Sequence, residues 1–131
     1  MSGELVLGIE SSCDETAAAV VGDGTDILSN VIHSQIDLHR QYAGVVPEIA
    51  SRSHTTRILP IVDAAMAEAG VRPQDLDAIA VTNRPGMIGC LLVGMTAAKT
   101  LSWLHDVPLV GVNHVLAHIH AHPKPFEPLR P

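Results

Sequence analysis

The sequence predicts an α/β fold in which a mixed sheet carries helices on its faces. Short apolar segments separated by turn residues fill the start of the chain. Helical spacing of apolar residues begins near the middle, and helices then alternate with further short apolar segments. Strands joined by tight turns pair antiparallel, and strands separated by helices pair parallel, so both kinds of pairing are expected in one sheet.

The first three elements are predicted strands. The apolar run 5–10 is short and ends at a turn, which is typical of a buried strand. Residues 16–21 follow, and Gly22-Asp23-Gly24 after them is a strong hairpin signal. Residues 25–35 alternate loosely and contain β-branched side chains, so they predict a third strand. Three such strands form an antiparallel meander.

Residues 37–46 have loop character, and a helix is predicted to begin at Pro47. Proline is tolerated in a first helical turn, and Glu48 behind it favours a helix N-terminus. Apolar residues then recur at helical spacing as far as Gly70, which ends the helix. Pro60 lacks a backbone donor, so we expect it to kink this helix or divide it in two.

The rest of the chain alternates between strand and helix. The predicted elements are a strand at 76–82, a turn at 83–86, a long apolar helix to about Leu104, a strand at 108–113 and a short helix at 114–122. The order βββαβαβα is that of a ribonuclease-H-like lobe, as found in the actin, sugar-kinase and heat-shock ATPase superfamily. We expect one such lobe at 1–122, and in the proline-rich residues 123–131 a connection to a second lobe that is missing here.

Charge and composition exclude several classes of protein. The net charge is −6, and no Lys or Arg precedes Arg40, so the chain lacks the basic patch of a direct nucleic-acid reader. If RNA is the substrate, most of its contacts must come from elsewhere. The apolar stretch 87–104 is interrupted by small and polar residues, which indicates a buried helix and no membrane span. Two distant cysteines and a start without a signal peptide favour a cytoplasmic protein.

The turn after the first strand is the first candidate site. Ser11 and Ser12 offer small hydroxyls and exposed amides that are able to cradle a phosphate. Asp14 and Glu15 offer carboxylates for a metal that bridges phosphates, or for orienting a water. The alternative is a solvated turn rich in Ser and Asp.

The turn between the fourth strand and the long helix is the second candidate site. Asn83 and Gly86 lie where a strand ends and a helix begins, and helix N-termini with flanking glycines bind anions. The segment matches neither the Walker pattern nor the dinucleotide fingerprint. The alternative is a plain β–α turn whose glycines permit close packing.

A pair of histidines is the third candidate site. His114 and His118 are four residues apart, on one face of the predicted helix, and neutral imidazole is a good ligand for zinc or iron. A third ligand, expected to be a carboxylate, must come from outside this segment. The alternative is a pair of structural or surface histidines. Val115 stands where zinc proteases carry the general base, which argues against that mechanism.

Four motifs together resemble the bacterial tRNA N6-adenosine threonylcarbamoyltransferases, in order and in spacing. They are GIESSCDET (8–16), GVVPEIASRSH (44–54), RPGMIGCLLVG (84–94) and GVNHVLAHIHAH (111–122). The resemblance implies transfer of a threonylcarbamoyl group from threonylcarbamoyl-AMP to the N6 amine of the adenosine beside the anticodon. It also implies two actin-like lobes with the active site between them. Arg84 departs from the glycine that is usual in the family.

The resemblance also implies roles for particular residues and partners. His114 and His118 would bind one iron or zinc ion, completed by an aspartate of the second lobe. The turn from Ser11 to Glu15 would lie near the phosphate and the metal, and Asp14 or Glu15 would accept the proton of the attacking amine. The partners would be a metal-free paralogous subunit, a small ATPase and tRNA, with no membrane. By itself the chain is expected to be inactive.

Two alternatives come from other classes of protein. One is a non-catalytic subunit like the metal-free paralogue, which would have no use for paired histidines. The other is the N-terminal lobe of a small-molecule kinase of the same superfamily, which would need a phosphate-acceptor site and no metal centre of this kind.

Overall fold

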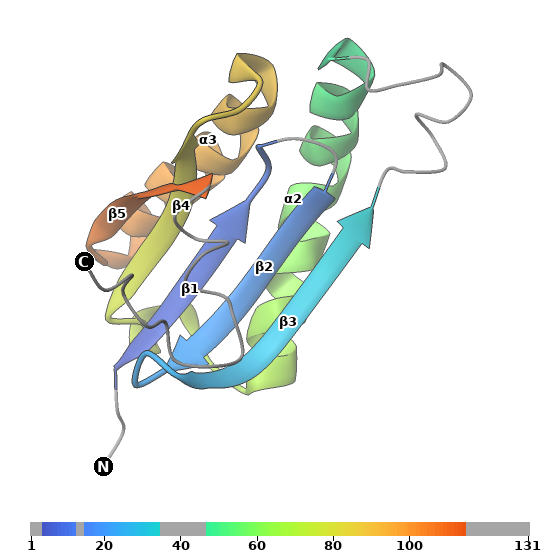
Figure 1. The fold of residues 1–131 in the computed structure, drawn as a ribbon. Coiled ribbons are helices and arrows are strands. Elements are labelled where there is room, and N and C mark those ends of the chain that lie inside the picture. The colour runs from blue at the N-terminus through green and yellow to red at the C-terminus, as the bar shows by residue number, and fades with distance from the viewer. Residues whose placement is uncertain (1–3, 13–14, 35–46, 115–131) are drawn as a thin grey trace, which may run out of the picture.

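The computed structural model describes residues 4–12, 15–34 and 47–114, which form one sheet and the helices that pack on it (Figure 1). The elements in chain order are β1 (Leu5–Glu10), β2 (Glu15–Gly22), β3 (Asp26–Ser34), α2 (Pro47–Ala69), the 3-10 helix η1 (Pro73–Asp75), β4 (Ala78–Arg84), α3 (Ile88–His105) and β5 (Leu109–Asn113).

The five strands lie in the order β3-β2-β1-β4-β5. β1 pairs antiparallel with β2, and β2 with β3, which confirms the predicted meander. β4 pairs parallel with β1, and β5 with β4, as expected for strands reached through helices. The fold is therefore the predicted α/β fold with a mixed sheet, and its strand order is that of a ribonuclease-H-like lobe.

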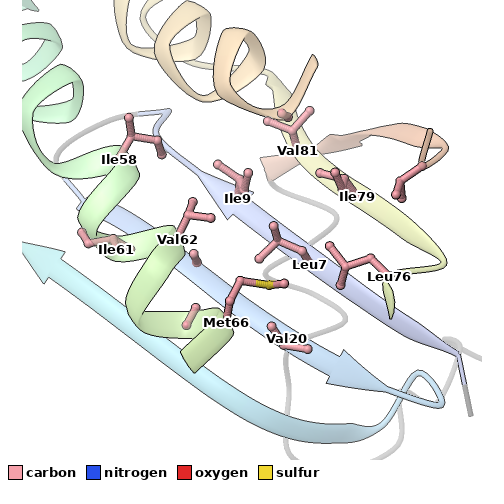
Figure 2. Close-up of a cluster of buried hydrophobic side chains, with 14 residues drawn as sticks. Leu7, Ile9, Val20, Ile58, Ile61, Val62, Met66, Leu76, Ile79 and Val81 are labelled. Atoms are coloured by element: carbon pink, nitrogen blue, oxygen red, sulfur yellow. The ribbon is translucent and has the colours of Figure 1, made fainter. Parts of the chain in front are cut away.

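α2 and α3 pack against each other and cover the same face of the sheet (Figure 1). Successive strand residues point to opposite faces, so every second residue of β1 and β4 enters the core beneath the helices. Figure 2 shows this core, in which apolar side chains of α2 meet those of the strands. Its labelled members are Leu7, Ile9, Val20, Ile58, Ile61, Val62, Met66, Leu76, Ile79 and Val81.

Pro60 does not divide α2, so that part of the expectation was wrong. The helix runs without a break from Pro47 to Ala69 with Pro60 inside it. Ile58 before the proline and Val62 after it are both buried in the same core cluster. Because both halves of the helix are anchored on one sheet, packing offsets the loss of a single backbone donor.

Other bounds differ from the expected ones by a few residues or lie outside the described part of the chain. The strand predicted at 76–82 is β4, which begins only at Ala78. The short helix η1 ends at Asp75, and the buried Leu76 lies in the link between η1 and β4. Of the predicted helix 114–122 the structure describes only its first residue, and the expected boundary at 122 lies beyond the described ranges. Neither α2 nor α3 combines the length and the apolar character needed to cross a lipid bilayer.

Candidate functional site

Three parallel strands bring the predicted motifs to one edge of the sheet. β1, β4 and β5 run in the same direction, so their carboxyl ends lie together. Ser11 and Ser12 directly follow β1, the 85–87 turn follows β4, and His114 follows β5. Ligand sites in α/β sheets form at this edge, beyond the carboxyl ends of the strands.

A glutamate that ends β1 joins these segments. Glu10 Oε2 lies 2.8 Å from Nδ1 of His114, although the two residues are 104 positions apart in the chain. Ser12 Oγ lies 3.0 Å from the same nitrogen. The backbone N–H of Ser12 donates to Glu10 Oε1 at 2.6 Å, and Thr82 Oγ1 donates to Glu10 Oε2 at 2.8 Å. The carboxylate therefore links β1, β4 and the end of β5.

The Glu10 carboxylate is held in its ionised form. Burial by itself would raise the pKa of this group, but hydrogen bonds from Ser12, His114 and Thr82 outweigh burial and keep the pKa below its ordinary value. Its side chain is 26% exposed and that of His114 is 31% exposed, so both remain within reach of a ligand. The site thus holds a fixed negative charge beside an imidazole.

Ser11 is buried and ties the turn to α3. Its hydroxyl donates to the Cys90 carbonyl at 2.7 Å and accepts from the Gly94 N–H at 3.0 Å. These two helix groups pair with each other in a regular α-helix, so the hydroxyl bridges them. The phosphate-binding role predicted for Ser11 stays a prediction, and its contacts here anchor the turn to the helix.

Replacing Gly94 with alanine is expected to lower the free energy of unfolding by about 1–3 kcal/mol. An added Cβ would lie 2.5 Å from Ser11 Oγ, which pushes the hydroxyl away from both of its partners. This cost outweighs the gain in helix propensity of about 1 kcal/mol for Gly to Ala. Denaturant unfolding followed by circular dichroism measures the difference.

A second background tests the cause of that loss. In a Ser11→Ala protein the clashing oxygen is gone, and the new Cβ would be 3.4 Å from that of residue 11. There Gly94→Ala should be neutral or stabilising, because only the helix propensity remains. An equal loss in both backgrounds would show that the Ser11 hydroxyl is not the reason for glycine at this position.

The turn after β4 packs directly on the turn after β1. The Met87 N–H donates to the Ser12 carbonyl at 3.2 Å. A Cβ on Gly86 would lie 2.7 Å from that same carbonyl oxygen, so only glycine permits this approach. Asn83 lies over Gly111 of β5, where a Cβ would be 2.2 Å from Asn83 Nδ2. The glycines therefore allow three neighbouring segments to come close.

The remaining predicted site residues are placed as follows. Glu15 begins β2 and is exposed. The Oδ1 atom of Asn83 is buried without a hydrogen-bond partner in the described part of the chain. Asp14 and His118 lie outside the described residues. His54 is fully buried on α2, with Nδ1 2.6 Å from Thr16 Oγ1.

Sequence reasoning gave no role to Glu10, which borders the first candidate turn, and it missed Thr82. The register pairs Ile9 with Val81, which brings the next residue of each strand, Glu10 and Thr82, side by side. A polar residue at the end of two neighbouring apolar strands was the available signal. It becomes informative only once the two strands are known to be parallel neighbours.

The donor chemistry at His114 fits the metal that the resemblance implies. An imidazole whose Nδ1 is bonded to a carboxylate is the usual form of a metal-binding histidine. Across residues 4–12, 15–34 and 47–114, no three His, Cys, Asp or Glu side chains gather where an ion would fit. Of the two predicted metal ligands the structure describes His114 alone, and its role as a ligand stays a prediction.

Comparison with known proteins decides the family. A family model described as TsaD, tRNA N6-adenosine threonylcarbamoyltransferase, matches residues 26–129. The chain belongs to this family. Curated members of that name from Treponema denticola and Thermomicrobium roseum are 60% and 58% identical to it over 116 and 117 residues. The matches cover 88% and 89% of this chain but 34% and 32% of those proteins, so the chain spans about a third of their length.

A solved structure supports the fold of this threonylcarbamoyltransferase family member. YeaZ from Pseudomonas aeruginosa superimposes with a TM-score of 0.61 at 22% sequence identity, over 84% of this chain and 43% of that chain. At this identity the likeness concerns the fold alone, and it agrees with an actin-like, ribonuclease-H-like lobe.

Proposed function

We propose that these 131 residues act as part of a longer polypeptide, one as long as the curated relatives. This polypeptide is called the full-length protein below, and it modifies tRNA. It transfers the threonylcarbamoyl group of threonylcarbamoyl-AMP to the N6 amine of the adenosine beside the anticodon. The amine nitrogen forms a bond to the carbamoyl carbon, the bond from that carbon to the phosphate oxygen breaks, and AMP leaves. The observation that carries the proposal is the 60% identity to a curated transferase through most of the chain. The contacts of His114 with Glu10 and Ser12 support a site for the transfer at the carboxyl ends of β1, β4 and β5.

The residues of the proposed site have different roles, which follow from the chemistry of their side chains. His114 and His118 hold one iron or zinc ion, together with an aspartate of a second lobe. A bound ion of this kind would polarise the carbamoyl carbonyl as a Lewis acid. Ser12, Gly86 and Asn83 line the place for the phosphate, and Ser11 anchors this turn to α3. The mixed carbamoyl-adenylate is already activated, so no covalent nucleophile is needed.

The proton of the attacking amine goes to a carboxylate. Asp14 or Glu15 accepts it in the proposed mechanism. Glu10 is a poor choice for this step, because three donors already bond to it and lower its pKa. Glu15 is exposed at the start of β2, where a substrate is able to reach it.

We also propose the setting of the reaction. The full-length protein works in the cytoplasm with a metal-free paralogous subunit and a small ATPase, and most contacts to tRNA come from outside this acidic chain. The 131-residue chain alone binds metal weakly and does not catalyse transfer, because the aspartate that completes the proposed metal site belongs to the second lobe. A non-catalytic subunit is the alternative, and it would bind no metal.

A reconstituted reaction tests the proposal. The full-length protein is mixed with its partners, threonylcarbamoyl-AMP and unmodified tRNA, and the modified nucleoside is measured by mass spectrometry. Metal content is measured on the same sample. Modified adenosine together with one metal ion per chain supports the transferase, whereas a metal-free protein that only stimulates another subunit supports the alternative. A protein that phosphorylates a small molecule instead would support the kinase.

Replacing Glu15 with glutamine separates proton acceptance from metal binding. In the full-length protein Glu15→Gln is expected to keep the metal and to lower single-turnover transfer by about 10²- to 10⁴-fold, the usual contribution of a general base. Metal analysis and rapid-quench kinetics measure the two effects. An unchanged single-turnover rate would remove Glu15 from the mechanism and leave Asp14 as the candidate.

A further inference from the structure

The contacts of His114 determine which of its two ring nitrogens binds a metal. Nδ1 lies 2.8 Å from Glu10 Oε2 and 3.0 Å from Ser12 Oγ. An ionised carboxylate only accepts hydrogen bonds, so the hydrogen between Glu10 and the ring must be carried by Nδ1. In a neutral imidazole the lone pair then belongs to Nε2. A metal bound by this histidine must therefore bind through Nε2.

Glu10 is itself held in place by groups other than the histidine. The Ser12 N–H donates to Oε1 at 2.6 Å, and Thr82 Oγ1 donates to Oε2 at 2.8 Å. Thr82 is only 5% exposed, so its hydroxyl is fixed by its surroundings in the sheet. Both carboxylate oxygens are engaged, and a carboxylate fixed in this way sets the orientation of the ring as well as its tautomer.

We propose that Glu10 is a positioning residue for the metal, which holds His114 in its Nδ1–H tautomer and directs Nε2 at the ion. The inference rests on the proposed function, in which His114 is a metal ligand. Glu10 acts through the histidine and neither binds the ion nor takes part in proton transfer. Thr82 and the Ser12 backbone in turn fix Glu10. The sheet therefore positions the carboxylate, the carboxylate positions the imidazole, and the imidazole positions the metal.

Replacing Glu10 with glutamine tests whether the carboxylate positions His114 for metal binding. The amide has nearly the same size but only one oxygen, so it cannot accept from both the Ser12 N–H and His114 Nδ1. The dissociation constant of the full-length protein for Zn²⁺ is expected to rise about 10- to 100-fold, which is the usual effect of removing such a partner. Competition with a chromophoric chelator measures this constant.

Two variants serve as controls. Glu15→Gln makes the same chemical change in the same region and should leave the Zn²⁺ affinity unchanged. Thr82→Val removes one donor to Glu10 but keeps the contact between Glu10 and His114, so its effect should be smaller than that of Glu10→Gln. An effect of Glu15→Gln as large as that of Glu10→Gln would mean that general loss of negative charge is responsible, and it would overturn the inference.

The tautomer itself is measured on the unsubstituted, metal-free protein. Nitrogen-15 NMR of labelled histidine, assigned by comparison with His114→Ala, should find the hydrogen of His114 on Nδ1. A hydrogen on Nε2 with none on Nδ1 would overturn the inference even if Glu10→Gln failed to fold, and so would an unchanged Zn²⁺ affinity of a folded Glu10→Gln protein. If His114→Ala bound Zn²⁺ as tightly as the unsubstituted protein, the metal site of the proposed function would fail instead.

Discussion

Replacing His114 with alanine is expected to remove the metal from the full-length protein and to lower the transfer rate at least about a hundred-fold. His114 follows β5 and is joined to β1 through Glu10 and to the turn through Ser12, so no neighbouring side chain can take its place without rebuilding these contacts. Lewis-acid stabilisation of a transition state is worth several kcal/mol, and about 3 kcal/mol corresponds to a hundred-fold in rate.

The same substitution at His105 is the matched control. His105 ends α3, at the opposite end of β5 from His114, and should keep both metal and transfer when replaced with alanine. Metal analysis, thermal unfolding and the transfer assay are run on both variants. Full metal content in a folded His114→Ala protein would contradict the proposed site, whatever the transfer rate.

Replacing Gly86 with alanine is expected to damage the site through the backbone. The new Cβ would lie 2.7 Å from the Ser12 carbonyl oxygen and 2.9 Å from Ser12 Cβ, and a backbone atom cannot rotate out of the way. The turn must move and lose the Met87 to Ser12 hydrogen bond. We expect a loss of about 1–3 kcal/mol of unfolding free energy. A displacement of about 1 Å near reacting groups lowers the rate about a hundred-fold, which we expect for transfer.

Gly24→Ala separates local strain from damage to the site. Gly24 has a φ of 75° in the turn between β2 and β3, and a Cβ there would meet nothing within 4 Å. Alanine in this conformation costs about 1–2 kcal/mol, because its Cβ crowds the carbonyl. Both variants should therefore lose stability, but only Gly86→Ala should lose transfer. Equal transfer rates in the two proteins would show that the close approach of Gly86 to Ser12 is irrelevant to function.

The sequence by itself determined the elements of this protein and the family motifs. Apolar segments separated by turn residues are local features, so the strand at 5–10 was predicted with its observed bounds. The hairpin at Gly22-Asp23-Gly24 was equally clear, because few residues adopt the positive φ values seen at Asp23 and Gly24. Pro60 misled the prediction because a propensity scale contains no term for packing on a sheet.

Only the tertiary structure decided which polar residues form the site. Glu10 is 104 residues from His114 and 72 from Thr82, and no local pattern joins them. They meet because β1, β4 and β5 are parallel neighbours in a fixed register. Ser11 and Ser12 looked equivalent in the sequence, yet one hydroxyl bonds to α3 and the other contacts His114. Two adjacent residues at the end of a strand point to opposite sides, and only the packing of α3 on β1 decides which of them is left to face the imidazole.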